Sequence, residues 1–225
     1  TPYRFIALPK SGITKFTQLK GKTVSTWFTG PQFILQALLK SQGIPADQVQ
    51  IQAQAASMEP FLQGKVDVAI ATVYDELPVL KRQGVTDLVV FNPADMGVNL
   101  PNEAIIVGEK FAKENPKLVQ AFLDASLRGW VYALAHEREA IDILMKSLQG
   151  GNRVHQEDEI AQIPALLLYG KGKTEGLGYV DMKALEYTNK FLVDNGVIKA
   201  PVDVEKAVDL SFWKHVPAKD KMATK

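Results

Sequence analysis

The chain has 225 residues, of which 46% are hydrophobic, and its formal net charge is +1. This composition is ordinary for a globular protein and gives no charged footprint for nucleic acid or an anionic membrane. The longest apolar runs, such as Ala104–Gly108, are far shorter than a membrane span. The sequence contains no cysteine, which excludes a disulfide framework and thiolate metal ligands.

The first part of the chain alternates strand patterns with helix patterns. Short runs of apolar and β-branched residues predict strands at residues 3–8, 22–27, 49–54, 66–73 and 88–91. Helical spacing of apolar residues predicts helices at residues 32–40, 58–63 and 77–83. Strands that alternate with helices are joined by right-handed crossovers, so this pattern predicts an α/β fold with a largely parallel sheet.

The second part of the chain is predicted to be mostly helical. Residues 103–107 predict one more strand, and helices are expected at residues 116–146, 157–169, 181–195 and 204–210. These helices have apolar faces but little sheet to cover, so residues 108–225 look like the outer layer of a domain whose sheet is largely absent. The chain opens at Thr1 on a strand, without a leader pattern, so we expect a mature, cut or truncated chain.

Polar and aromatic residues gather where two predicted strands end. Trp27, Phe28, Thr29 and Gly30 follow one strand, and Tyr74-Asp75-Glu76 follow another. In open α/β sheets, ligands bind beyond the carboxyl ends of the strands. An aromatic ring offers a flat face for a ring system, and backbone N–H groups at a helix start favour an anion or a carbonyl. The alternative is that Trp27 or Phe28 packs in the core.

Several ordered motifs give the chain a resemblance to a known family. The motifs are Leu19-Lys20-Gly21-Lys22-Thr23-Val24, Trp27-Phe28-Thr29-Gly30, Gly64-Lys65-Val66-Asp67-Val68-Ala69, Tyr74-Asp75-Glu76, Asp95-Met96-Gly97-Val98, Phe111 to Pro116, Phe191-Leu192 and Gly196-Val197-Ile198. Each motif alone is weak, but their succession resembles the NMT1/THI5-like group of periplasmic binding proteins. Relatives in that group bind thiamin pyrimidines, riboflavin or alkylsulfonates.

The resemblance implies a type II periplasmic-binding-protein fold, with two βα lobes joined by a hinge. It assigns residues 1–9 to a remnant of lobe I and the hinge strand, residues 10–98 to lobe II, and residues 99–225 to the return hinge and the helical part of lobe I. The expected hinge lies near Leu8–Ser11 and Asn99–Ala104. Family members carry further residues before the point that matches Thr1, so we expect the N-terminal part of lobe I to be missing from this chain.

The resemblance also implies a binding site in the cleft between the lobes. Glu76 is expected to face the cleft and to accept N–H bonds from an aminopyrimidine or a similar heterocycle. A carboxylate at a helix start is the alternative reading. The expected ligand-binding residues are Trp27, Phe28, Thr29, Gly30, Ser57, Tyr74, Asp75, Glu76 and Asn102. Helix capping explains Ser57 equally well.

The function favoured by these features is that of a substrate-binding protein of an ABC importer. Its expected ligand is a small heterocycle or organic anion, with a pyrimidine thiamin precursor favoured, and its expected partner is the permease. The expected location is periplasmic or extracytoplasmic, as a lipid-anchored or secreted protein. We expect no enzyme activity, no cofactor and no metal, since His136, His155 and His215 lack metal-ligand spacing and are expected on the surface.

Three alternatives stay open. The same fold could serve as the ligand-sensing domain of a membrane signalling receptor. A eukaryotic branch of the family resembles a pyrimidine-precursor synthase that uses a histidine, pyridoxal phosphate and a cysteine-rich iron motif, which this cysteine-free chain lacks. A partner copy could cover the apolar helix faces, so a homodimer is the alternative to a missing N-terminal segment.

Overall fold

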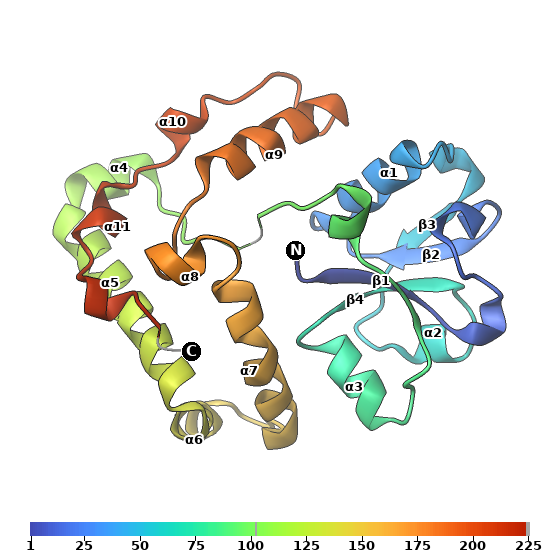
Figure 1. Cartoon of the computed structure of the whole chain (residues 1–225), viewed down its shortest axis with the longest axis horizontal. Coiled ribbons are helices and arrows are strands. Elements are labelled where there is room, and N and C mark those ends of the chain that lie inside the picture. Colours follow the sequence, from blue (N-terminus) through green and yellow to red (C-terminus); the bar gives the residue numbers. More distant parts are fainter. Residues whose placement is uncertain (102, 224–225) are drawn as a thin grey trace. The chain divides into compact units, whose positions relative to one another are not determined.

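The computed structural model describes residues 1–101 and 103–223. The chain divides into two compact units (Figure 1). Unit 1 comprises Thr1–Leu100 and Lys190–Pro201, and unit 2 comprises Pro101–Asn189 and Val202–Lys225. None of the described helices is long and apolar enough to cross a membrane.

Unit 1 is built on a five-stranded sheet. Its strands are β1 (Tyr3–Ala7), β2 (Thr23–Thr26), β3 (Gln50–Ala53), β4 (Val68–Thr72) and β5 (Val89–Phe91). They lie in the order β3-β2-β4-β1-β5. Strand β2 is parallel to β3 and β4, whereas β1 pairs antiparallel with β4 and β5. Four strands therefore run in one direction, as predicted, and β1 alone runs in the other.

The prediction placed residues 1–9 in lobe I, together with the helical residues 99–225, and β1 lies elsewhere. Strand β1 lies inside the sheet of unit 1, where Phe5, Ile6 and Ala7 are fully buried. A continuous apolar run is typical of a strand that is covered on both faces, and this explains its interior place. No α-helix connects β1 to β2. The rule that helical crossovers join parallel strands therefore does not fix the direction of β1. The division into lobes with a hinge stays a prediction.

Helices cover both faces of the sheet in unit 1 (Figure 1). They are α1 (Pro31–Ser41), α2 (Glu59–Leu62) and α3 (Glu76–Arg82). Because side chains alternate across a strand, Phe5 joins the core beneath α1, whereas Ile6 packs with Phe61 of α2 and Leu80 of α3. Phe191 belongs to the same core as α1. The fold of unit 1 is thus a three-layer α/β arrangement.

Unit 2 is helical in its described residues. Its helices are α4 (Glu109–Glu114), α5 (Pro116–Ala135), α6 (Glu137–Ser147), α7 (Arg153–Leu167), α8 (Gly172–Glu175), α9 (Met182–Asp194), α10 (Val204–Ala207) and α11 (Ser211–His215), with the last turn of α9 counted in unit 1. Leu127 and Leu134 of α5 pack with Leu177 and Val216 in its core. Trp213 closes this core by donating its indole N–H to the carbonyl of Leu177 at 2.8 Å.

The strand predicted at residues 103–107 is not formed. Ile105, Ile106 and Val107 lie in an irregular segment, and Ile106 is 90% exposed. A β-branched run becomes a strand only when a neighbouring strand accepts its backbone hydrogen bonds. The described part of unit 2 contains no strand that could do so. The predicted contrast between an α/β part and a helical part is confirmed.

Candidate functional site

Three parallel strands of unit 1 end at one edge of the sheet. Strand β2 lies between β3 and β4 and is parallel to both (Figure 1). The loops that follow them, residues 27–30, 54–58 and 73–75, therefore share that edge, which we call the strand-end edge. Ligands bind at such edges in open α/β sheets.

A pocket of about 220 Å³ lies in unit 1 between α2, with the loop that precedes it, and α3, along which its lining extends from Asp75 to Gln83. Its lining residues are Ala56, Ser57, Met58, Glu59, Leu62, Asp75, Glu76, Val79 and Gln83. Three predicted site residues, Ser57, Asp75 and Glu76, are thus brought together. Ligand pockets usually measure about 300–1,000 Å³, so this one has room for a small ring or for part of a larger solute.

Glu76 lines this pocket and is also tied to the end of β4. One oxygen, Oε2, accepts hydrogen bonds from the Thr72 N–H and the Thr72 hydroxyl, both at 2.7 Å. The same hydroxyl oxygen accepts the Asp75 N–H at 3.2 Å. Glu76 therefore holds the turn between β4 and α3. The pattern of the sequence did not indicate this structural role, since it depends on the side-chain rotamer of Glu76.

Ser57 lies directly before Met58, the N-cap residue of α2. Its hydroxyl oxygen accepts the Glu59 N–H at 3.1 Å, and the side chain is exposed. Ser57 thus bonds the first N–H of α2 from the residue before the N-cap, and it lines the pocket as well.

Gln54 is a residue of the strand-end edge that no sequence motif indicates. Its side-chain carbonyl accepts a hydrogen bond from the Ser25 hydroxyl on β2, and its amide donates to the Ile70 carbonyl on β4 at 3.1 Å. It therefore ties the ends of three neighbouring strands together. A polar residue at the end of an alternating run was the only available signal.

The loop after β2 holds the aromatic candidates. Trp27 is half-buried and packs against the unit 1 core, with its ring centroid 6.1 Å from that of Tyr3. Phe28 is 57% exposed and Thr29 is exposed. None of these residues lines the pocket beside α3. The core-packing alternative therefore describes Trp27 and not Phe28.

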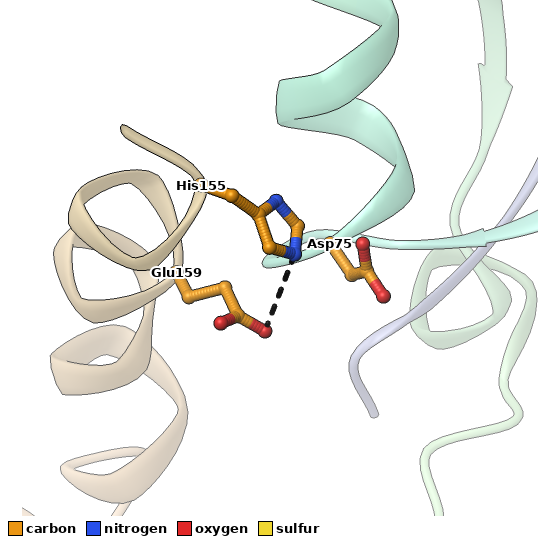
Figure 2. Close-up of side chains that lie close together, drawn as sticks. All are labelled: Asp75, His155 and Glu159. Atoms are coloured by element: carbon orange, nitrogen blue, oxygen red, sulfur yellow. Dashed lines mark ion pairs between the residues drawn. The ribbon is translucent and has the colours of Figure 1, made fainter. Parts of the chain in front are cut away.

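The remaining predicted site residues are Tyr74, Asp75 and Asn102. Tyr74 and Asp75 are half-buried in the turn before α3, where Figure 2 draws Asp75. Asn102 lies outside the described residues. The nine predicted ligand-binding residues thus remain predictions, with Ser57, Asp75 and Glu76 sharing one pocket.

Unit 2 carries one histidine–carboxylate pair. His155 and Glu159 lie one turn apart on α7, with Nε2 and Oε1 separated by 3.9 Å (Figure 2). His136 and His215 are exposed as predicted, whereas His155 is half-buried, which the prediction of a surface position did not anticipate. Neither unit, taken by itself and within its described residues, gathers three histidine or carboxylate ligands close enough for a metal ion.

Known proteins similar to this chain were found by sequence. Riboflavin-binding protein RibY of Chloroflexus aurantiacus is 30% identical over 220 residues, which cover 94% of this chain and 61% of that protein. Formylaminopyrimidine-binding protein of Halalkalibacterium halodurans is 26% identical over 178 residues, covering 77% of this chain and 54% of that protein. The chain thus spans somewhat more than half the length of these relatives.

The structure and the family model agree with this similarity. The periplasmic aliphatic sulphonate binding protein SsuA of Escherichia coli superposes with a TM-score of 0.65 at 14% identity, covering 92% of this chain and 65% of that one. This likeness shows that the chain has the α/β fold of periplasmic binding proteins. The model of the family described as NMT1/THI5 like matches residues 1–140. The chain therefore belongs to the NMT1/THI5-like family.

Proposed function

We propose that this chain is the solute receptor of an ABC importer and that it binds a small heterocycle at the strand-end edge of unit 1. Family membership supports this proposal, because two relatives are named for binding riboflavin and formylaminopyrimidine. Both of those solutes are nitrogen heterocycles with N–H donors.

The observation that carries the proposal is the carboxylate lining of the pocket. Glu59, Asp75 and Glu76 contribute carboxylates to it, and no lysine, arginine or histidine lines it. A carboxylate accepts hydrogen bonds only, so this lining suits a solute that presents N–H donors. Such charge-assisted bonds are about twice as strong as neutral ones.

The size of the pocket favours the smaller of the two ring systems. A volume of about 220 Å³ accommodates a substituted pyrimidine more readily than the three fused rings of a flavin. A pyrimidine related to a thiamin precursor is therefore the proposed ligand. Trp27 and Tyr74 do not line this pocket, so they are proposed to contact a part of the solute that extends beyond it along the strand-end edge, since aromatic faces stack on heterocycles.

We propose a binding role without turnover. A catalyst needs a nucleophile or base that is oriented by a partner, or a metal centre. In unit 1 the side chains of Ser25, Gln54 and Glu76 at the strand-end edge are engaged in hydrogen bonds within the chain. The proposed partner is the importer permease, the proposed location is extracytoplasmic, and no cofactor is proposed.

Native mass spectrometry of freshly purified protein tests the proposal, followed by calorimetric titration with an aminopyrimidine and with riboflavin. The expected result is saturable binding of one heterocycle per chain and a preference for the pyrimidine. A parallel incubation is expected to return the solute chemically unchanged. Sustained product formation, or no binding of either heterocycle, would overturn the proposed function.

A further inference from the structure

A second, smaller pocket adjoins the pocket beside α3. Its volume is about 40 Å³, and it lies where β2 and β3 end. The residues that line it are Ser25, Gln52, Ala53, Gln54, Ala55, Ser57, Pro60, Phe61 and Val66. Ser57 lines both pockets, and residues of α2 contribute to each. The two pockets are therefore neighbours on the α2 side of the strand-end edge.

The side chains of Gln54 and Met58 stand between the two pockets, and we call them the dividing wall. Gln54 lines the smaller pocket, and Met58 lines the larger one. The two side chains are in contact, because the Gln54 amide nitrogen Nε2 donates to the Met58 sulfur at 3.1 Å. Met58 is 8% exposed, so its side chain is packed inside unit 1. The wall thus closes the larger pocket toward the smaller one.

Hydrogen bonds to buried groups hold the dividing wall in place. The Gln54 side-chain carbonyl accepts from the Ser25 hydroxyl, and Nε2 also donates to the Ile70 carbonyl at 3.1 Å. Ser25 is 4% exposed and Ile70 is fully buried, so both bonds are made away from water. A solute that pushed the Gln54 side chain aside would leave these buried groups without partners, which is costly. The wall therefore resists displacement.

We infer that Gln54 is a specificity-determining residue, which restricts the strand-end edge to single-ring solutes by keeping the two pockets apart. The inference rests on the proposed function, because it treats the pocket beside α3 as the ligand site. That pocket measures about 220 Å³, below the usual range of about 300–1,000 Å³. Shortening the Gln54 side chain joins the two pockets, whose combined volume with the vacated space approaches the lower end of that range. A fused ring system such as a flavin then gains room.

The test compares riboflavin with 4-aminopyrimidine by calorimetric titration of the 225-residue chain. The wild type is expected to bind the aminopyrimidine more tightly. In Gln54→Ala, the ratio of the riboflavin affinity to the aminopyrimidine affinity is expected to rise by about tenfold or more, since steric discrimination in a pocket is typically worth about 10–200-fold. Gln36→Ala is the matched control, because Gln36 is an exposed glutamine of α1 outside both pocket linings. It is expected to keep the wild-type ratio.

Met58→Ala is a second variant, which keeps the inference testable where the loss of the Gln54 bonds unfolds the protein. It opens the dividing wall from the side of the larger pocket, while Gln54 keeps its bonds to Ser25 and Ile70. The same rise in the ratio is expected. The ratio is the readout because a merely structural role of Gln54 would weaken the binding of both solutes together and leave the ratio unchanged.

Two outcomes overturn the inference alone. One is a wild type that binds riboflavin as tightly as the aminopyrimidine. The other is a pair of folded variants, Gln54→Ala and Met58→Ala, neither of which raises the ratio. In both cases a heterocycle still binds, so the proposed receptor function stands. The proposed function itself fails when neither solute binds to the wild type, and the inference then fails with it.

Discussion

Glu76 combines a predicted ligand role with an observed structural one. Its Oε2 atom accepts both polar hydrogens of Thr72, and the side chain lines the pocket beside α3. The sequence predicted that Glu76 would lie at a strand end, because Tyr74-Asp75-Glu76 follow the strand predicted at residues 66–73. The bond to Thr72 could not be predicted, since it depends on how the side chain folds back over the turn.

Truncation of Glu76 is expected to lower the stability of the protein. Glu76→Ala removes the acceptor of the Thr72 N–H and hydroxyl, and leaving these buried donors unsatisfied costs about 1–3 kcal/mol in the free energy of unfolding. Urea unfolding measures the change. Glu59→Ala is the matched control, because Glu59 is exposed and accepts a hydrogen bond from the exposed Gln63 side chain. Equal stability of the two variants would contradict the structural role of Glu76.

Asp75 offers a cleaner test of ligand binding than Glu76 does. Asp75→Asn keeps the shape of the side chain but replaces an acceptor carboxylate in the pocket lining by an amide. We expect it to weaken the binding of an aminopyrimidine by about 1–3 kcal/mol, as measured by calorimetry. Glu114→Gln, on the surface of α4, is the control and is expected to leave the affinity unchanged. An unchanged affinity in Asp75→Asn would remove Asp75 from the site.

At the scale of the elements, local sequence patterns predicted where helices form, whereas contacts with other residues decided where these helices begin and end. Pro31 stands in the first turn of α1, as predicted. The helix predicted at residues 116–146 breaks at His136 into α5 and α6. Helix α7 begins before its predicted start, because the Asn152 side chain caps it by accepting the His155 N–H at 3.3 Å. Apolar periodicity does not report such caps.

Gly30 is the element boundary at which a glycine is needed. Its φ of 142° lies in a region that L side chains rarely adopt, although no atom would clash with an added Cβ. Gly30→Ala is therefore expected to destabilise the protein by about 1–3 kcal/mol through backbone strain alone. Gly129→Ala, in the interior of α5, is expected to stabilise by about 0.5–1 kcal/mol. Thermal unfolding followed by circular dichroism checks both signs, and a neutral Gly30→Ala would contradict the strain.

At the scale of the whole molecule, unit 2 leaves large apolar side chains exposed. Leu118 and Phe122 lie one turn apart on α5 and are 58% and 59% exposed. The exposed Ile105, Ile106 and Val107 form the segment predicted as a strand. The sequence predicted too little sheet for the apolar faces of these helices to pack on, and the described part of unit 2 contains no strand. It could not predict what covers these side chains, because an apolar face does not specify its partner.

We expect the 225-residue chain on its own to self-associate through such exposed apolar surface. Replacing Leu118 and Phe122 together by serine should shift the chain toward the monomer, as measured by light scattering during gel filtration over a range of concentrations. Serine at Lys117 and Arg128 is the matched control, since it changes two exposed residues of the same helix without removing apolar surface. A wild-type chain that stays monomeric at high concentration would contradict the expectation.

Hydrogen–deuterium exchange with and without a saturating heterocycle tests the central claim most directly, because it locates binding along the chain. The account predicts slower exchange in peptides that cover residues 27–33, 54–58 and 73–76, the loops at the ends of β2, β3 and β4. Protection confined to α5 and α6, or no change with a solute that calorimetry shows to be bound, would contradict a solute site at the strand-end edge.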